Sequence, residues 1–326
     1  MPRLEIRSES WPIAGTFTIS RGSKTQADVV VVELHEGGAR GRGECVPYPR
    51  YDESVASVTR QIESLAERIE AGLSRDELLE AMPAGAARNA VDCAMWDLEA
   101  KRAGRNAWFL AGLEQPKPVV TAYTLSLDTP EKMGAAAREN AHRPLLKLKL
   151  AGEGDLERVS AVRAGAPKAE LIVDANEGWT ADHYRSFAPK LAALGVVMIE
   201  QPLPAGKDDG LAGLERPVPV CADESCHDTS TLDALVGKYD LVNIKLDKTG
   251  GLTEGLRMKA AAEAHGLGIM VGCMVGSSLA MAPGVLLAQG ARFVDLDAPL
   301  LLARDRQPGL RYDGSTVFPP LASLWG

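Results

Sequence analysis

The amino-acid sequence predicts an α/β protein: a parallel barrel of the (β/α)8 type that follows a smaller α+β domain. Short apolar runs recur eight times after Pro118, at an average spacing of about 24 residues, which is the length of a strand, a crossover helix and two turns. The runs are continuously apolar, as in strands that are buried on both faces of a parallel sheet. The first third of the chain lacks this repeat. The eight runs are Val119–Ala122, Leu145–Leu148, Leu171–Val173, Val196–Ile199, Val218–Ala222, Leu241–Leu246, Ile269–Gly272 and Phe293–Leu296.

Residues 1 to about 115 are expected to form the compact α+β domain. Phe17–Ser20 and Val29–Leu34 have the alternating or β-branched pattern of antiparallel strands. Glu53–Ala71 and Ala86–Ala103 have helical patterns, and Gly104 follows the second as a C-cap.

Residues 116–298 are expected to form the barrel. The stretches between the runs are mostly helix-like; Pro130–Ala141, for example, has a proline in its first turn. A doubly wound open sheet is the alternative, but no GxGxxG follows the first strand and no Walker loop is present. The last run is followed by a segment rich in Pro and Gly instead of a full helix. The tail, about 299–326, is therefore expected to return to the first domain.

One uncharged segment, Leu267–Ala288, is long enough to span a bilayer. Its glycines, its serines and Pro283 divide it near Gly276–Ser278 into a strand-like and a helix-like half. We therefore expect it within the barrel and predict no membrane partner.

The charge balance argues against further classes of binding partner. The chain has 36 Lys and Arg against 44 Asp and Glu, a net charge of −8, which argues against nucleic acid or an anionic membrane as the main partner. Five cysteines without a CxxC pair, and an N-terminus without a leader pattern, favour a reduced, cytoplasmic chain. The sequence leaves open whether the chain forms a homo-oligomer.

Charged side chains gather where the predicted strands end, and this is the rim that carries the chemistry in barrels of this type. In strand order, from the second strand to the eighth, they are Lys147 and Lys149, Asp174 with Asn176, Glu200, Asp223 with Glu224, Lys245 and Asp247, and Asp295 and Asp297.

The order of the strands converts these residues into a site. The second and sixth strands are diametrically opposed in an eight-membered ring, so Lys149 and Lys245 should face each other across the mouth. The three strands between them each contribute one carboxylate, Asp174, Glu200 and Asp223. Three converging carboxylates would repel one another strongly unless a hard divalent cation were bound. Mg²⁺ suits this all-oxygen set, whereas Zn²⁺ would be expected to recruit His or Cys.

Such a site suits abstraction of an α-proton. A metal that chelates a substrate carboxylate would place the adjacent α-carbon between the two lysines and stabilise the charge of an enediolate. A lysine with its ordinary pKa is a poor base at pH 7, so we expect burial and nearby cations to depress its pKa. One lysine on each face is the arrangement that a racemase or epimerase requires.

Each residue also has a structural interpretation. A lone strand-end carboxylate is usually a helix cap or an ion-pair partner, and a lone lysine is usually solvated. The conjunction is more specific: the acids are 26 and 23 residues apart, with lysines 25 residues before and 22 after. Metal-dependent hydrolysis in a barrel would call for histidine ligands at the rim, and a binding protein would have no use for two opposed lysines.

The motifs resemble those of the enolase superfamily, muconate-lactonising subgroup: KLKL at 147–150, DANEGW at 174–179, EQPLP at 200–204, ADES at 222–225 and NIKLDKTGG at 243–251. The resemblance implies a modified TIM barrel, (β/α)7β, with an α+β capping domain. It also implies Mg²⁺ at Asp174, Glu200 and Asp223, an acid/base pair formed by Lys149 and Lys245, and support of the ligands by Asn176 and Glu224.

Within this subgroup the sequence is most similar to the dipeptide epimerases. Asp295 and Asp297 resemble a DxD pair that holds the free α-ammonium of the substrate, and Arg21, in TISRGSK, matches an arginine that pairs with the side chain of a C-terminal Glu. The resemblance also assigns substrate contacts to Lys147, Thr124, Cys273 and Val275. It implies epimerisation of L-Ala-D/L-Glu in murein peptide recycling; o-succinylbenzoate synthase, N-acylamino-acid racemase and muconate cycloisomerase are the alternatives.

Overall fold

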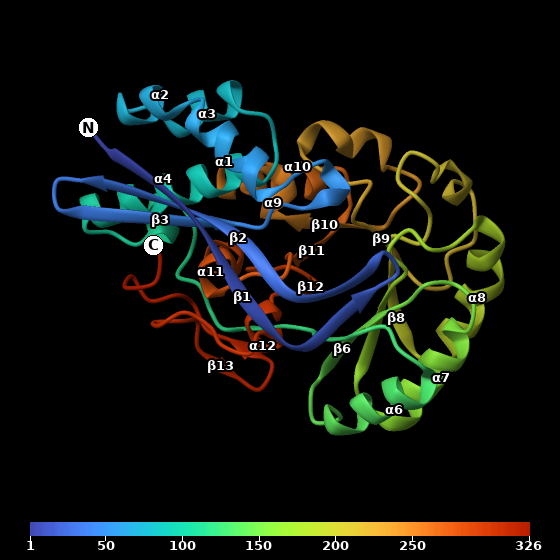
Figure 1. Cartoon of the computed structure of the whole chain (residues 1–326). Coiled ribbons are helices and arrows are strands. Elements are labelled where there is room, and N and C mark those ends of the chain that lie inside the picture. The colour runs from blue at the N-terminus through green and yellow to red at the C-terminus, as the bar shows by residue number, and fades with distance from the viewer.

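The computed structural model describes every residue from 1 to 326. The chain begins with a three-stranded antiparallel sheet flanked by helices (Figure 1). The predicted strands are parts of longer ones, and the helix predicted over Glu53–Ala71 is divided into α1 and α2. The elements are β1 (Arg3–Ile19), β2 (Gly22–Glu36), β3 (Ala39–Cys45), the 3-10 helix η1 (Pro49–Tyr51), α1 (Val55–Glu63), α2 (Ala66–Glu70), α3 (Arg75–Ala81), α4 (Ala86–Ala103) and α5 (Ala107–Leu110).

Helix α4 packs directly on β3, and two glycines make this close approach possible. A Cβ atom at Gly43 would lie 2.0 Å from the carbonyl oxygen of Ala90, and one at Gly41 would lie 2.2 Å from that of Ala94. Both distances are far inside van der Waals contact, so only glycine fits at these positions. The apolar side chains of β2 and α4 thereby form one core with α1, α2 and α3.

Eight parallel strands follow, and their order in the sheet is their order in the sequence. A hydrogen bond from the backbone N–H of Ala122 to the carbonyl oxygen of Val294 (2.8 Å) joins the first strand to the last. The predicted barrel is confirmed. Its strands are β5 (Tyr123–Leu125), β6 (Leu145–Lys149), β7 (Glu170–Asp174), β8 (Val196–Glu200), β9 (Val220–Ala222), β10 (Leu241–Lys245), β11 (Gly268–Gly272) and β12 (Phe293–Val294).

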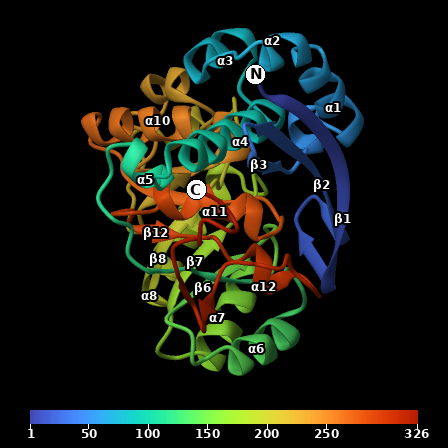
Figure 2. The ribbon, with the colours of Figure 1, turned by 90° about the vertical axis from the view of Figure 1, so that its left-hand side faces the viewer.

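Helices cover the outside of the barrel, and Figure 2 shows them around the strands with the N-terminal sheet to one side. The segment Leu267–Ala288 divides as predicted, into β11 and α11, and no helix in the structure is both long and apolar enough to cross a bilayer. The helices are α6 (Pro130–Glu139), α7 (Asp155–Gly165), α8 (Ala181–Ala193), η2 (Asp209–Leu211), η3 (Thr229–Ala234), α9 (Leu246–Thr249), α10 (Leu252–Ala264), α11 (Ser278–Leu287) and α12 (Ala298–Leu301).

The prediction that Val119–Ala122 forms the first barrel strand is wrong. Its first two residues form β4 (Val119–Val120), which pairs antiparallel with β14 (Thr316–Val317) in a small sheet completed by β13 (Tyr312–Asp313). The apolar character of this run therefore reflects pairing with the C-terminal tail, and the barrel begins a few residues later at β5.

The tail continues from this small sheet to α4. The indole N–H of Trp325 donates to the carbonyl oxygen of Cys93 (2.9 Å), and the backbone N–H of Gly326 donates to Asp97 (2.7 Å). A guanidinium N–H of Arg42 donates to the carbonyl oxygen of Ser323 (2.8 Å).

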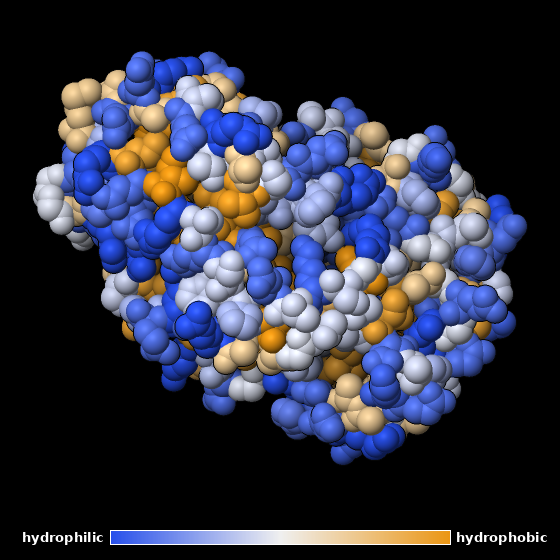
Figure 3. Space-filling view, in the orientation of Figure 1, coloured by the Kyte–Doolittle hydropathy of each residue, from blue (hydrophilic) through white to orange (hydrophobic).

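The face of the molecule that is turned to the viewer in Figure 1 is mainly hydrophilic, as Figure 3 shows, with apolar side chains at the surface chiefly beside the N-terminal sheet and its helices.

Alternation along the strands places the charged residues above an apolar layer. Eight side chains, one from each strand or the residue before it, form a buried cluster: Ala122, Leu145, Ile172, Met198, Cys221, Leu241, Met270 and Phe293. Because the side-chain period of a strand is two, the residues two and four positions later face the same interior. Among those positions are Thr124, Lys147, Lys149, Asp174, Glu200, Asp223, Asn243, Lys245, Gly272 and Asp295. The register of each strand thus brings these residues to one end of the barrel.

Candidate active site

Three buried carboxylates converge at the carboxyl end of β7, β8 and β9. Asp174, Glu200 and Asp223 each offer an oxygen within 4.8 Å of the other two. Their exposed fractions are 0, 0 and 2%. The side-chain amide of Asn243 donates to Glu200 Oε1 (2.8 Å), and the backbone N–H of Asn176 donates to Asp174 Oδ1 (2.9 Å). The sequence-predicted acidic trio is therefore assembled and oriented by its neighbours.

Two lysines flank this trio from opposite sides of the barrel. Lys149, at the end of β6, lies with its Nζ 2.6 Å from Asp174 Oδ2. Lys245, at the end of β10, lies with its Nζ 2.6 Å from Asp223 Oδ2. Strands β6 and β10 are separated by β7, β8 and β9, so the two ammonium groups approach from opposite walls.

Lys147 lies one layer deeper than Lys149. Its Nζ is 2.7 Å from Glu200 Oε2, 2.8 Å from Asp295 Oδ2 and 3.3 Å from Asp174 Oδ2. The residue is 1% exposed. Three carboxylates thus surround an ammonium that the sequence predicted to contact substrate.

The carboxylates determine the ionisation of the site. Burial raises the pKa of Asp174, but Lys149 and Lys147 outweigh it and bring the pKa to about 2. Burial and the charge of Asp174 raise the pKa of Glu200 to about 7. We expected a depressed pKa for the lysine base. Instead, although burial lowers the pKa of Lys245, Asp223 and Glu200 outweigh it and raise that pKa well above its ordinary value.

The donor set fits a hard divalent cation. All three converging groups are carboxylates, no histidine or cysteine joins them, and they lie within 4.8 Å of one another. This is the oxygen-only chemistry that Mg²⁺ prefers. A cation held there would also offset the negative charge that holds the pKa of Lys245 high.

A cavity of about 790 Å³ opens above these groups, between the barrel mouth and the β1–β2 hairpin. The predicted substrate contacts Thr124, Cys273, Val275, Asp295 and Asp297 all line it. Asp297 Oδ2 accepts from the backbone N–H of Thr124 (2.6 Å). Burial and the charge of Asp295 raise the pKa of Asp297 to about 7.

Arg21, in the turn between β1 and β2, reaches across to the barrel. Its Nη2 donates to Glu224 Oε1 (2.7 Å), and its Nη1 donates to the carbonyl oxygen of Asn176 (3.0 Å) and to Glu177 Oε2 (3.1 Å). Arg50 pairs with both oxygens of Glu177 (2.8 Å each). Glu224, predicted to support the metal ligands, is thus the partner of Arg21.

Sequence reasoning missed Lys248 and Asn243. The Nζ of Lys248 donates to Asp223 Oδ1 (2.6 Å), and the residue is 1% exposed. Asn243 could have been found, because it lies two residues before Lys245 on β10 and so faces the same interior. Lys248 lies on the short helix α9, whose turn back toward Asp223 has no strand periodicity to reveal it.

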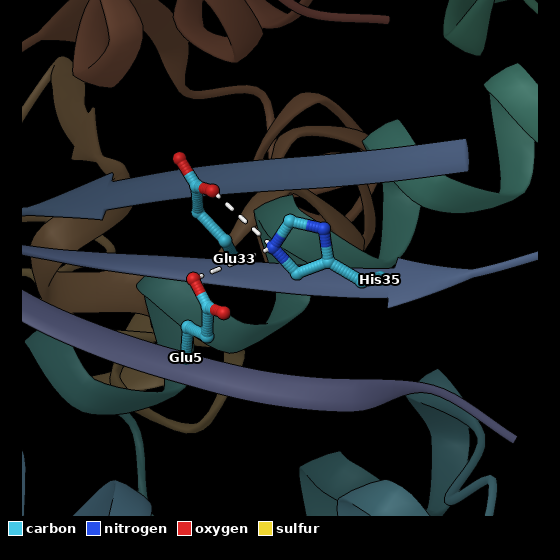
Figure 4. A group of neighbouring side chains, drawn as sticks. All are labelled: Glu5, Glu33 and His35. Carbon is cyan, nitrogen blue, oxygen red and sulfur yellow. Dashed lines mark ion pairs between the residues drawn. The ribbon is translucent and has the colours of Figure 1, made fainter. Parts of the chain in front are cut away.

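A second group of possible metal ligands, two carboxylates and a histidine, lies at the open end of the β1–β2 hairpin (Figure 4). Glu5, Glu33 and His35 each offer an atom within 4.8 Å of the others. Arg3 pairs with Glu5 (2.6 Å) and Arg7 pairs with Glu33 (2.8 Å). Because arginines already neutralise both carboxylates, we interpret this group as an ion-pair network.

Comparison with known proteins agrees with this geometry. Residues 1–112 match the family model "Mandelate racemase / muconate lactonizing enzyme, N-terminal domain", and residues 132–302 match "Enolase C-terminal domain-like". The L-Ala-D/L-Glu epimerase of Escherichia coli strain K12 is 48% identical, over 96% of this chain and 98% of that protein. The N-acetyl-D-glutamate racemase of a Pseudoalteromonas species is 45% identical, over 91% and 95%.

Among solved structures, an enolase family member from Agrobacterium tumefaciens with homology to dipeptide epimerases, bound to sodium and L-Ala-L-Glu with an ordered loop, superimposes with a TM-score of 0.98. It is 56% identical, and the match covers 100% of both chains. A barrel with an N-terminal capping domain, a rim of three carboxylates between two lysines, and these matches over both domains lead to one assignment: this chain is a member of the enolase superfamily, of the mandelate racemase and muconate-lactonizing enzyme type.

Proposed function

We propose that this protein is an epimerase that inverts the α-carbon of the C-terminal glutamate in L-Ala-D/L-Glu. The observation that carries the proposal is the position of Lys149 and Lys245 on opposite walls, with the acidic trio between them. Two bases on opposite faces of an α-carbon can remove a proton from one side and return one to the other. The names of the relatives at 48% and 56% identity support a dipeptide with C-terminal glutamate as substrate.

In this proposal the lysines exchange roles with the direction of the reaction. One receives the α-proton of the D-isomer and the other delivers a proton to form the L-isomer; the reverse reaction uses them in the opposite order. Both are almost fully buried, at 7% and 6% exposed, so water has little access to the proton while it is held.

Asp174, Glu200 and Asp223 would hold Mg²⁺. When bound, the ion supplies stabilisation of the negative charge that develops on the substrate carboxylate as the α-proton leaves. Asn243 and Asn176 orient Glu200 and Asp174, respectively, through their hydrogen bonds. Asp223 is held between Lys245 and Lys248.

The far side of the cavity would hold the N-terminal residue of the dipeptide. Asp297 would receive the α-ammonium, since it is buried and its carboxylate accepts hydrogen bonds from Thr124 alone. Asp295 offers a buried oxygen without a hydrogen-bond partner, Oδ1, while its Oδ2 pairs with Lys147. Cys273 and Val275 would line the peptide backbone, and Lys147 would act from below through Asp295 and Glu200 and not by direct contact.

N-acetylglutamate is the second candidate substrate, because a relative at 45% identity bears the name of its racemase. It shares the carboxylates and the α-proton but has no ammonium. Buried Asp297 favours the dipeptide, since it forms no ion pair in the structure and an uncharged acetyl group would leave it without a cation.

The experiment is a comparison of wild-type protein with L-Ala-D-Glu, N-acetyl-D-Glu, the hydrated precursor that dehydrates to 2-succinylbenzoate, and cis,cis-muconate in D₂O. With Mg²⁺ present, we expect loss of the glutamate α-proton signal in NMR and formation of the L,L-dipeptide. EDTA should stop the reaction, and added Mg²⁺ should restore it. Faster turnover of N-acetyl-D-Glu or of one of the diacids would overturn the choice of substrate.

We further assign the chemistry to the barrel, residues 116–298, and closure of the site to residues 1–115 with the tail at about 299–326. A cytoplasmic role in recycling murein peptides follows from this substrate, and the five free cysteines support a reducing compartment.

A further inference from the structure

A buried arginine of the N-terminal domain reaches the barrel. Arg88, on α4, is 6% exposed, and its guanidinium donates to four backbone carbonyl oxygens. Its Nη2 donates to Thr249 (2.7 Å) and its Nε to Gly250 (3.1 Å), at the end of α9. Its Nη1 donates to Leu79 (3.2 Å) and Met82 (3.1 Å), at the end of α3. Arg88 therefore joins the ends of two helices that belong to different domains.

The contact with α9 depends on close approach of the backbone. The last carbonyl oxygens of a helix have no partner within the helix, and a guanidinium at that end satisfies them. Gly250 has a φ of 74°, and a Cβ atom there would lie 2.4 Å from Arg88 Nε. The neighbouring residue on α4, Asn89, donates from its side-chain amide to Asp247, also on α9 (2.9 Å). Helix α4 thus holds α9 from outside the barrel.

Helix α9 carries a lysine that reaches the acidic trio. Lys248 is 1% exposed, and its Nζ donates to Asp223 Oδ1 (2.6 Å) and to the carbonyl oxygen of Asn243 (3.1 Å). It directly precedes Thr249, whose carbonyl oxygen accepts from Arg88. A shift at the end of α9 would therefore move Lys248 and release one side of Asp223.

We propose that Arg88 is a positioning residue for the metal site: it fixes α9, and through Lys248 it fixes the orientation of Asp223. This inference rests on the proposed function, in which Asp223 holds Mg²⁺. Loss of a group that orients a metal ligand commonly weakens metal binding by about tenfold to a hundredfold. Arg88 acts one residue further out than Lys248, so the expected effect is smaller. Docking of the N-terminal domain would then be a condition for a complete metal site.

The test measures Mg²⁺ binding by isothermal titration calorimetry in the wild type, in Arg88→Met and in Arg42→Met. Arg42 is the matched control, because it is 8% exposed and donates to the carbonyl oxygens of Ser323 and Leu324, which lie in the tail and do not line the cavity. Both variants should lower the midpoint of thermal unfolding, by about 5 °C. We expect the Kd for Mg²⁺ to rise by about fivefold to tenfold in Arg88→Met and to stay within about twofold in Arg42→Met.

A double variant tests the route of the effect. Because Arg88 acts through Lys248 in this account, adding Arg88→Met to Lys248→Met should change the Kd for Mg²⁺ by less than about twofold. A larger further loss would overturn the route through Lys248. If Lys248→Met does not fold, the comparison of Arg88→Met with Arg42→Met decides.

A Kd for Mg²⁺ in Arg88→Met within about twofold of the Arg42→Met value would overturn the role of Arg88. If Arg88→Met does not fold, Arg88→Lys takes its place, with an expected rise in Kd of at least about threefold, because lysine keeps the charge but not the planar fork that reaches carbonyl oxygens of both helices. These results would leave the metal site itself intact. Wild-type protein that binds no Mg²⁺ would overturn the proposed metal site, and the inference with it.

Discussion

Lys248 and Asp223 form a buried ion pair of 2.6 Å, through the oxygen of Asp223 that does not meet Lys245. The same Nζ donates to the carbonyl oxygens of Asp223 and Asn243. One carboxylate at the centre of the site is thus fixed on both sides by ammonium groups, and Lys248 connects it to β10.

Lys248→Met should therefore damage stability and activity together. The change removes the donor to Asp223 Oδ1 and one donor from each of the carbonyl oxygens of Asp223 and Asn243, which we expect to lower the free energy of unfolding by about 3 kcal/mol. Because Asp223 would then be held by Lys245 alone, we also expect kcat to fall by at least about tenfold. Guanidinium denaturation and epimerase assays measure the two effects. Lys132→Met, which removes a 70%-exposed partner of Asp128, is the control and should change neither. Unaltered kcat in Lys248→Met would show that Asp223 needs no such partner.

Asp297→Asn should separate the two candidate substrates. Asparagine still accepts from the N–H of Thr124, but it cannot neutralise an α-ammonium. We expect kcat/KM for L-Ala-D-Glu to fall by about a hundredfold and that for N-acetyl-D-Glu to change by less than about threefold. Equal losses with both substrates would mean that Asp297 holds the site together and does not recognise charge.

Asp247 predicts a pH dependence of stability. It is 6% exposed, it accepts from the N–H of Val46 and the amide of Asn89 (2.9 Å each), and burial raises its pKa to about 7. Between about pH 4 and pH 7 the folded protein holds a proton on this group that the unfolded chain has lost. Its contribution to stability therefore falls as pH rises through this window, by about 1.4 kcal/mol per pH unit.

Asp247→Asn should remove this contribution, since asparagine keeps the acceptor oxygen and does not titrate. Between pH 5 and pH 7.5, the free energy of unfolding should fall by less in the variant than in the wild type. Urea denaturation at the two pH values measures it, with the exposed Asp182→Asn as control. Identical differences in variant and wild type would contradict a raised pKa at this position.

The barrel was predictable because the patterns that indicate it lie within short stretches of the sequence. Each strand is a short apolar run, the runs recur at a regular average spacing, and the residue that follows a run lies at the same rim in each case. Asp174, Glu200 and Asp223 are found together for that reason alone. The same logic, applied strictly, also places Lys147 below Lys149, because two residues along a strand of 3.3 Å rise lie one layer apart. Its burial beneath the acids was thus implicit in the KxK spacing.

The features that the sequence did not predict depend on contacts between distant segments. Val119–Val120 resembles a barrel strand but pairs with Thr316–Val317, almost 200 residues later, and no local pattern distinguishes the two outcomes. The partner of Arg21 could not be predicted either, because Glu224 reaches it only once the hairpin lies over the barrel. Charge pairing across the domain boundary is visible only in the folded chain.

The central claim is that two lysines act on opposite faces of one α-carbon, and single-lysine variants in D₂O test it most directly. With Mg²⁺, Lys149→Ala and Lys245→Ala should each lose epimerisation by more than about a thousandfold. Each should still exchange the α-proton of one isomer of the dipeptide for deuterium, and the isomer should differ between the two variants. Exchange of the same isomer by both variants, or full epimerisation by either, would contradict the account.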